Sequence, residues 1–430
     1  MKEVVIVGGL RTPFIKAWTL FNFIPAQELG RVVVSELLQR LELDPAQVDE
    51  VIFGNIVTPA EAANIARVIA LMGGLPAHVP AYTISRNCAS GVESIAHAYY
   101  MIQRGEAEIV IAGGVESMSN IPLIYQKETA EIFTALSRAK SLKQRLQAFL
   151  KSRPRHFFRP VIGLQQGLTD GYCGLNMGET AEVLAREWVI TRQQQDKFAF
   201  TSHQRAAAAA EAGKLREEIV PVYVPPDYEA VLDDNGIRKG QSLEALAELK
   251  PAFDSCHGTV TAGNASQITD GAAAVVVMSA EKARALGYES LGSIRTYAYA
   301  ALKPTRMGLG PALAIPKALE KAKLQFTDIQ LWEINEAFAA QVLAVEKALN
   351  SKRFAQEYLG RDEVVGEIDD EMLNVNGGAI ALGHPVGASA TRLVITLLRE
   401  MQRRNLQLGL VSMCVGGGQG AAMILERLTR

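Results

Sequence analysis

The sequence predicts an α/β fold built from two similar halves, and three observations support this. Short β-branched runs alternate with helical stretches, a pattern typical of sheets whose faces are covered by helices. The chain has 430 residues, which is too long for one ordinary core, so two or three packed units are expected. A similar order of elements also occurs twice along the chain, as described below.

The predicted strands are short apolar runs at residues 4–7, 51–53, 109–112, 274–278, 331–334 and 408–412. The predicted helices have apolar residues at helical spacing and cover residues 26–41, 91–104, 312–322 and 388–403. These elements are spread over both ends of the chain, and a long segment with a different pattern separates them.

The internal repeat is weak but ordered. A helix is followed by LDPAQVDEVIFG at 43–54 in the first half and by LQFTDIQLWEIN at 324–335 in the second. Each half then has a small-residue turn that enters a helix (87–91 and 383–389), and closes with a strand followed by a Gly-rich turn (109–117 and 410–420). Two such halves stacked face to face would bring corresponding turns to one place.

The composition is that of an ordinary globular protein, with 48% apolar residues, 21% charged residues and a net charge of −2. This charge gives no reason to expect nucleic acid as a partner. No apolar run reaches the roughly 18–20 residues of a membrane helix, and residues 1–7 lead directly into a strand pattern without a signal peptide. Four cysteines suit a reducing compartment, so a cytoplasmic location is expected.

Residues 118–270 are predicted to be a large insertion between the halves. Within it, residues 137–160 contain eight Lys or Arg and no acidic residue, and a basic amphipathic helix is predicted there. Its apolar stripe consists of Leu142, Leu146, Phe149 and Leu150. One interpretation is a surface helix with this stripe on the core; the other is a basic patch for an anionic ligand tail, a partner or a membrane surface.

Cys88 is the first candidate for chemistry. It follows a strand-like stretch and begins CASG at 88–91, the start of a predicted helix. The positive end of a helix dipole and its free N–H groups lower the pKa of a thiol, which favours the nucleophilic thiolate. A buried structural cysteine would also fit this position.

His384 and Cys414 lie in glycine-rich segments of the second half. His384 is in GGAIALGHP at 377–385, a tight loop before a helix, where its imidazole could act as a base for Cys88. Cys414 ends an apolar strand and is followed by three glycines whose N–H groups could bind an oxyanion. A phosphate loop is a weaker interpretation, because no Lys-Ser/Thr pair follows the glycines.

Asn335 ends a predicted strand and begins NEAFAA at 335–340. A helix cap explains an asparagine at this position, although its amide could also orient a water or donate to a carbonyl oxygen. Each of the four residues is ambiguous alone, and the set is specific.

The blocks RNCASG, MGETAE, GTVTAGNAS, DGAAA, WEINEAFAAQ, NVNGGAIALGHPVGAS and CVGGGQGAAMI occur in this order and resemble the thiolase family from end to end. The resemblance implies the thiolase fold, with two similar α/β halves, stacked central sheets covered by helices, and an inserted loop domain. The expected segments are 1–117 for the first part of the N-terminal half and 118–270 for the loop domain, which ends in a return to that half. Residues 271–290 would be the half's last strand and helix, and 291–430 the C-terminal half.

The resemblance also implies the roles of the site residues. Cys88 would be the acyl-accepting nucleophile, His384 its activator, and Cys414 the acid and base for the substrate α-carbon. Asn335, through a water, and His384 would form one oxyanion hole, and the backbone N–H groups of Cys88 and Gly416 the other. Ser266 and Ala262 match pantetheine-contacting positions, while Met177, Met307 and Phe338 match positions that line the acyl and pantetheine pocket. Coenzyme A would be a substrate, with no permanently bound cofactor and no metal.

The expected reaction is cleavage of a 3-ketoacyl-CoA by CoA in fatty-acid β-oxidation. The stretches at 141–155 and 354–373 resemble the β-subunits of fatty-acid-oxidising trifunctional complexes. This likeness implies a hydratase/dehydrogenase α-subunit as partner and peripheral membrane contact through residues 137–160. The resemblance to thiolases itself implies a homodimer or tetramer. Two alternatives remain: a biosynthetic acetoacetyl-CoA thiolase, and a non-catalytic lipid carrier on the same fold. A ketoacyl synthase is disfavoured by Cys414 before three glycines.

Overall fold

The computed structural model describes residues 2–154 and 160–428. Its central feature is a sheet in which nine strands follow one another in the order β12-β13-β14-β11-β1-β10-β5-β3-β4. The strands of the N-terminal half are β1 (Val4–Arg11), β3 (Glu50–Gly54), β4 (Ala81–Ile84), β5 (Ile109–Glu116) and β10 (Thr269–Ser279), with β2 (Ile15–Lys16) paired to β10. Those of the C-terminal half are β11 (Gly292–Ala301), β12 (Leu331–Ile334), β13 (Leu408–Val415) and β14 (Gln419–Glu426).

The predicted repeat is present as a repeat of strand order and direction. In the N-terminal half β3 runs parallel to β5, and β10 and β1 follow antiparallel. In the C-terminal half β12 runs parallel to β13, and β14 and β11 follow antiparallel. The strands of each half form one part of this sheet, and the two parts, called the two sheets below, join where β1 meets β11 over two residue pairs. The sequence did not predict this connection.

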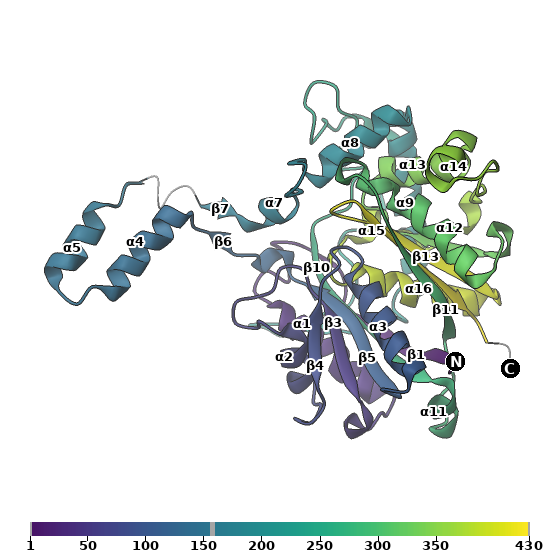
Figure 1. Cartoon of the computed structure of the whole chain (residues 1–430), viewed down its shortest axis with the longest axis horizontal. Helices are drawn as coiled ribbons and strands as arrows, with labels where there is room; N and C mark the ends of the chain where they lie inside the picture. The colour runs from purple at the N-terminus through teal and green to yellow at the C-terminus, as the bar shows by residue number, and fades with distance from the viewer. Residues whose placement is uncertain (1, 155–159, 429–430) are drawn as a thin grey trace.

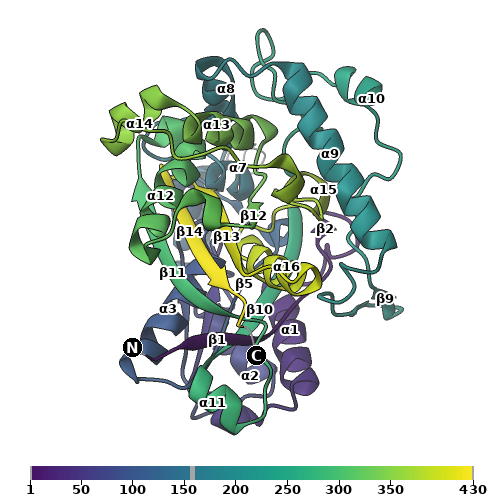
Figure 2. The same ribbon diagram turned by 90° about the vertical axis from the view of Figure 1, so that its right-hand side faces the viewer.

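Helices cover the sheets in layers (Figure 2). The outer layer of the N-terminal half contains α1 (Ala26–Arg40) and α2 (Ile65–Met72), whose apolar faces share one core with the sheet. The outer layer of the C-terminal half contains α12 (Gly310–Ala322) and α13 (Ala339–Leu349). Between the sheets, α3 (Ser90–Arg104) and α16 (Ser389–Arg404) share a third core with strands of both halves. The thiolase-like architecture of two covered halves is therefore confirmed.

The remaining helices connect and flank these layers. They are α7 (Gly163–Gly167), α8 (Met177–Glu187), α9 (Arg192–Glu211), α10 (Leu243–Ala247), α11 (Ala280–Ala285), α14 (Lys352–Leu359) and α15 (Ala379–Leu382), and the hairpin β8 (Val222–Val224) with β9 (Glu229–Val231) follows α9. In the part of the chain that the structure describes, no helix combines the length and the apolar character needed to cross a bilayer.

The two glycines after residue 112, which the sequence predicted to form a turn, lie inside β5. A Cβ on Gly113 would lie 2.3 Å from the carbonyl oxygen of Ala273, and one on Gly114 would lie 1.9 Å from that of Gly387. These glycines therefore allow neighbouring backbone to approach the strand, and the prediction of a turn at this position was wrong.

An arm projects from the body of the molecule (Figure 1). It consists of α4 (Lys127–Arg138) and α5 (Leu142–Leu150), and the short strands β6 (Leu123–Ile124) and β7 (Val161–Ile162) form its base. The single helix predicted over 137–160 is corrected to the shorter α5, because the backbone is extended at Ala139 and the Ser141 side chain caps a new helix. Residues 155–159 of the predicted helix lie outside the described residues.

The apolar stripe of α5 does not face the core. Leu142 is 84% exposed, and Leu146, Phe149 and Leu150 are also exposed. The interpretation with the stripe on the core was therefore wrong, since helical periodicity defines an apolar face without saying what covers it.

Candidate active site

Cys88 lies in a tight turn between β4 and α3. The preceding residue, Asn87, has a left-handed backbone with φ of 45°, and its side chain donates to the carbonyl oxygen of Gly416 at 2.9 Å. The helix begins at Ser90, so Cys88 precedes the helix by two residues rather than starting it. The turn is thus fixed to the glycine loop that follows Cys414.

The electrostatic environment of Cys88 differs from the prediction. The backbone N–H groups of Gly416 and of Cys88 itself point to the thiol and lower its pKa, as expected for a nucleophile. Burial raises the pKa more than these groups lower it, and the charge of Glu116 raises it further. The predicted net lowering was wrong, because the helix-terminus argument left out desolvation. Cys88 therefore requires a base to become a thiolate.

His384 has the properties of such a base. Burial and the nearby charge of Arg392 lower its pKa to about 4, so the ring is neutral at pH 7. Its Nδ1 lies 2.6 Å from the Ser389 hydroxyl, and its Nε2 lies 3.4 Å from Nδ2 of Asn335. The structure thus brings two predicted site residues, His384 and Asn335, into direct contact.

The turn that carries Cys88 belongs to the N-terminal half, and the loop that carries His384 belongs to the C-terminal half. The helices that follow them, α3 and α16, pack against each other between the sheets. A Cβ on Gly91 would lie only 2.4 Å from Oγ1 of Thr391. A side chain at position 91 would separate the first turns of α3 and α16. This close contact places the turn of Cys88 beside the loop of His384.

Cys414 lies near the end of β13 and is fully buried. Burial raises its pKa well above the usual value, and the neighbouring Cys88 raises it further. Cys414 therefore holds its proton as a neutral thiol. Its own N–H lowers its pKa in part, whereas the N–H groups of both Gly416 and Cys88 lower that of Cys88. Two nearby thiols in different environments suit different protonation roles.

Several residues predicted to line a substrate pocket pack around Cys414. Met307, Phe338 and Cys414 share one apolar cluster, against which Met177 also packs. Ser266 donates its N–H to the carbonyl oxygen of Ala337 at 2.9 Å, beside Phe338, while Ala262 is exposed. The cluster is apolar next to the two thiols, as a site for an acyl chain requires.

Sequence reasoning missed three residues that support the site: Asn87, Ser389 and Glu116. The buried Glu116 carboxylate accepts hydrogen bonds from the Asn55 side chain at 3.0 Å and from the N–H groups of Ile56 and Val57 at 3.1 Å. It also accepts from the N–H of Gly387 in the His384 loop, and burial raises its pKa to about 7. For Ser389, the only sequence feature that could have indicated a role was its position five residues after His384. Nothing in the local sequence indicated a role for Glu116.

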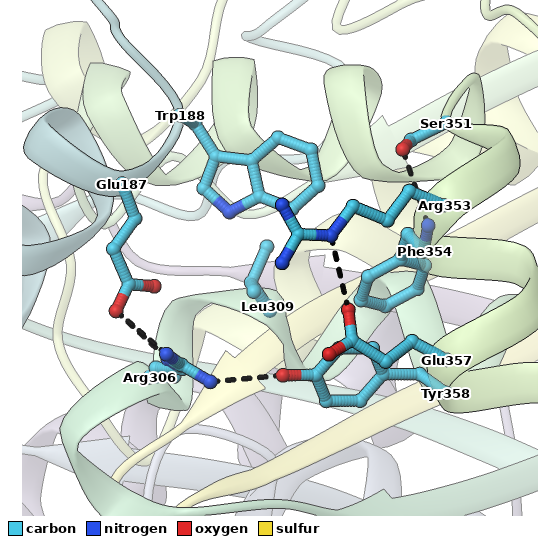
Figure 3. Close-up of a pocket in the computed structure, with 9 residues that line it drawn as sticks. All are labelled: Glu187, Trp188, Arg306, Leu309, Ser351, Arg353, Phe354, Glu357 and Tyr358. Carbon is cyan, nitrogen blue, oxygen red and sulfur yellow. Dashed lines mark hydrogen bonds and ion pairs between the residues drawn. The ribbon is translucent and has the colours of Figure 1, made fainter.

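A separate pocket lies between α8, α14 and the turn 304–309, and none of the predicted site residues lines it (Figure 3). Arg306 bridges Glu187 at 2.9 Å and the Tyr358 hydroxyl at 2.8 Å, and Arg353 pairs with Glu357 at 3.4 Å. The charges in this pocket are thus paired with one another, and they tie α14 to α8.

Comparison with known proteins agrees with the fold. The thiolase N-terminal domain matches residues 4–281, and the thiolase C-terminal domain matches residues 288–427. The chain therefore belongs to the thiolase family, a family of acyltransferase enzymes.

Relatives and solved structures match over nearly the whole chain. A 3-ketoacyl-CoA thiolase of Escherichia coli O139:H28 is 44% identical over 425 residues, which are 99% of this chain and 97% of the relative. The Bacillus anthracis acetyl-CoA acetyltransferase superposes with a TM-score of 0.87 at 38% identity, covering 100% of this chain and 99% of its own. Human mitochondrial 3-ketoacyl-CoA thiolase in complex with CoA gives 0.86 at 36% identity, covering 100% and 98%.

Proposed function

We propose that this enzyme cleaves 3-ketoacyl-CoA with CoA to give acetyl-CoA and a shortened acyl-CoA, through an acyl-Cys88 intermediate, in fatty-acid β-oxidation. The observation that carries this proposal is the arrangement of two differently placed thiols with a neutral histidine. Cys88 faces the N–H of Gly416, Cys414 is buried beside it, and His384 contacts Asn335.

In the first step, Nε2 of His384 takes the proton of the Cys88 thiol, and the sulfur attacks the C3 ketone of the substrate. The ketone oxygen becomes an oxyanion. The backbone N–H groups of Cys88 and Gly416, which point to the Cys88 sulfur, donate hydrogen bonds to it.

In the second step, the oxyanion collapses and the C2–C3 bond breaks, which leaves an acyl-Cys88 thioester and the enolate of acetyl-CoA. The protonated Nε2 of His384, together with Asn335 acting through a water, holds the thioester oxygen of the enolate. Cys414 gives its proton to C2, for which a neutral buried thiol is suited, and acetyl-CoA forms.

In the third step, the sulfur of a CoA thiol attacks the acyl-Cys88 thioester while the Cys414 thiolate takes its proton. The acyl group leaves as acyl-CoA, and His384 returns its proton to Cys88. The apolar cluster of Met177, Met307 and Phe338 would hold the acyl chain and pantetheine, with Ser266 and Ala262 at the pantetheine.

Thiolysis rates on 3-ketoacyl-CoA substrates from four to sixteen carbons test this proposal. We expect cleavage at every length and faster cleavage of longer chains. Activity restricted to acetoacetyl-CoA would favour the biosynthetic alternative. Purified protein that binds CoA and cleaves no substrate would favour the non-catalytic carrier.

We also propose that the arm of α4 and α5 docks this enzyme on an anionic membrane surface. Support comes from the exposed stripe of Leu142, Leu146, Phe149 and Leu150 and from exposed basic residues on the same arm, Lys140, Lys143, Arg145 and Lys151. An amphipathic helix with a basic polar face binds at the interface of anionic lipids.

Replacing Leu146 and Phe149 together by glutamine is expected to weaken binding to vesicles that contain phosphatidylserine by roughly tenfold or more, since each exposed apolar side chain contributes about 1.5–3 kcal/mol when buried. Co-sedimentation measures the binding, and thiolysis in solution should be unchanged. The matched control is Leu20 and Phe23 to glutamine, two exposed apolar residues on the body. Equal binding of the arm variant and wild type would contradict membrane docking.

The oligomeric state and the partner subunit are proposed from the same family likeness. We propose a homodimer or tetramer that works with a hydratase/dehydrogenase α-subunit, which supplies the 3-ketoacyl-CoA. A cytoplasmic location is supported by the four cysteines, all of which are free thiols in this structure, as in a reducing compartment.

A further inference from the structure

The hydroxyl of Ser389 lies between two groups of different kinds. It is 2.9 Å from the carbonyl oxygen of Pro385 and 2.6 Å from Nδ1 of His384. A carbonyl oxygen can only accept a hydrogen bond, and a hydroxyl has one proton to donate. The contact with Pro385 is therefore favourable only when the serine donates its proton there.

Because the Ser389 hydroxyl donates its proton to Pro385, its oxygen can only accept a hydrogen bond from Nδ1 of His384. Nδ1 must then carry a proton, because two lone pairs at 2.6 Å would repel each other. The contact of the other ring nitrogen, Nε2, independently indicates the same tautomer. Nε2 lies 3.4 Å from Nδ2 of Asn335, a donor group, and a donor favours an unprotonated ring nitrogen.

We propose that Ser389 is a positioning residue that fixes the tautomer of His384, keeping the ring proton on Nδ1 so that Nε2 is free to act as the base. Ser389 is fully buried on the first turn of α16, and its own N–H also donates to Pro385 at 3.0 Å. The loop and the ring are therefore held by one fully buried residue. This inference rests on the proposed role of His384.

The tautomer matters because of the order of proton transfers. Nε2 must be empty to accept the proton of Cys88, and once filled it is the N–H that faces the enolate oxygen of the departing acetyl-CoA. A ring with its proton already on Nε2 can donate a hydrogen bond but cannot take a proton there. An enzyme with the wrong tautomer keeps its geometry and loses its base.

Replacing Ser389 by alanine removes the only contact recorded for Nδ1 in the described part of the chain. We expect the ring proton to move to Nε2, and kcat/KM for thiolysis to fall by roughly 10²-fold, the lower range for loss of a general base. Alkylation of Cys88 by iodoacetamide should also slow at pH 7, and its pH profile should move to higher pH.

The ring proton is measured directly by 15N NMR of the resting enzyme with labelled histidine. The chain has six histidines, and the spectrum of His384→Asn assigns the signals of His384. The matched control is Ser94→Ala, because Ser94 is an equally buried serine on α3 whose hydroxyl contacts the backbone carbonyls of Gly91 and Gly113. This control should keep both the tautomer and the rates of the wild type.

The proposal requires that the tautomer and the rates change together in Ser389→Ala. A proton that stays on Nδ1, or rates within twofold of wild type, overturns it. The NMR measurement needs no turnover, so a wild-type enzyme that failed to cleave 3-ketoacyl-CoA would sink the proposed function and still leave the tautomer testable.

Discussion

Replacing Cys88 by alanine is expected to lower kcat/KM for thiolysis by on the order of 10⁴-fold or more, because the variant has no sulfur to carry the acyl group. Fold and CoA binding should persist, since the side chain of Cys88 is only partly buried and removing it leaves a small space. The measurement is steady-state thiolysis of a long-chain 3-ketoacyl-CoA.

Mass spectrometry of the intact protein gives a second measurement of the same prediction. Wild type incubated with an acyl-CoA should gain the mass of one acyl group, and Cys88→Ala should gain none. Cys256→Ala is the control, because this cysteine is exposed and carries no proposed role. Persistent acylation of the Cys88 variant would show that another residue accepts the acyl group.

The sequence predicted the layered fold because its signals are local and repeated. Continuous apolar runs such as 331–334 and 274–278 are typical of strands in a sheet whose two faces are both covered by helices, and both runs form strands in the structure. The join between β1 and β11 was beyond this reasoning, because it depends on how two halves meet. The bounds of the four predicted segments stay predictions.

Candidate site residues were recognisable in the sequence where one chemical group lies at a turn or strand end, and their catalytic roles stay predictions. Cys88, His384, Asn335 and Cys414 each occupy a turn or a strand end, and the structure places His384 against Asn335 and Cys88 beside Cys414. Their protonation was harder to predict, because desolvation dominates the pKa of both thiols and depends on the whole surrounding fold.

Supporting residues were not predictable for a related reason. Glu116 acts through backbone groups at residues 56, 57 and 387, and the latter is far away in sequence. Asn87 acts through a contact with Gly416 across the two halves. Such residues show no pattern of their own, because their function lies in which distant backbone groups the fold brings to them.

The second large effect is expected at Cys414. Cys414→Ala should lower kcat for thiolysis by roughly 10²- to 10⁴-fold, because the C2 carbanion loses the acid that protonates it. The same variant should still transfer an acetyl group from acetyl-CoA to Cys88, since this exchange between two thioesters moves no proton to or from carbon. A variant that loses one reaction and keeps the other separates the roles of the two thiols.

Two measurements on one preparation reveal this split. Thiolysis follows the full reaction, while exchange of labelled CoA into acetyl-CoA follows acylation of Cys88 alone. Cys88→Ala should lose both activities, whereas Cys414→Ala should lose only the first, because the N–H groups of Gly416 and Cys88 that face the sulfur remain in place. Loss of exchange in a folded Cys414 variant would mean that Cys414 assists acylation, and thiolysis within tenfold of wild type would mean that another group protonates C2.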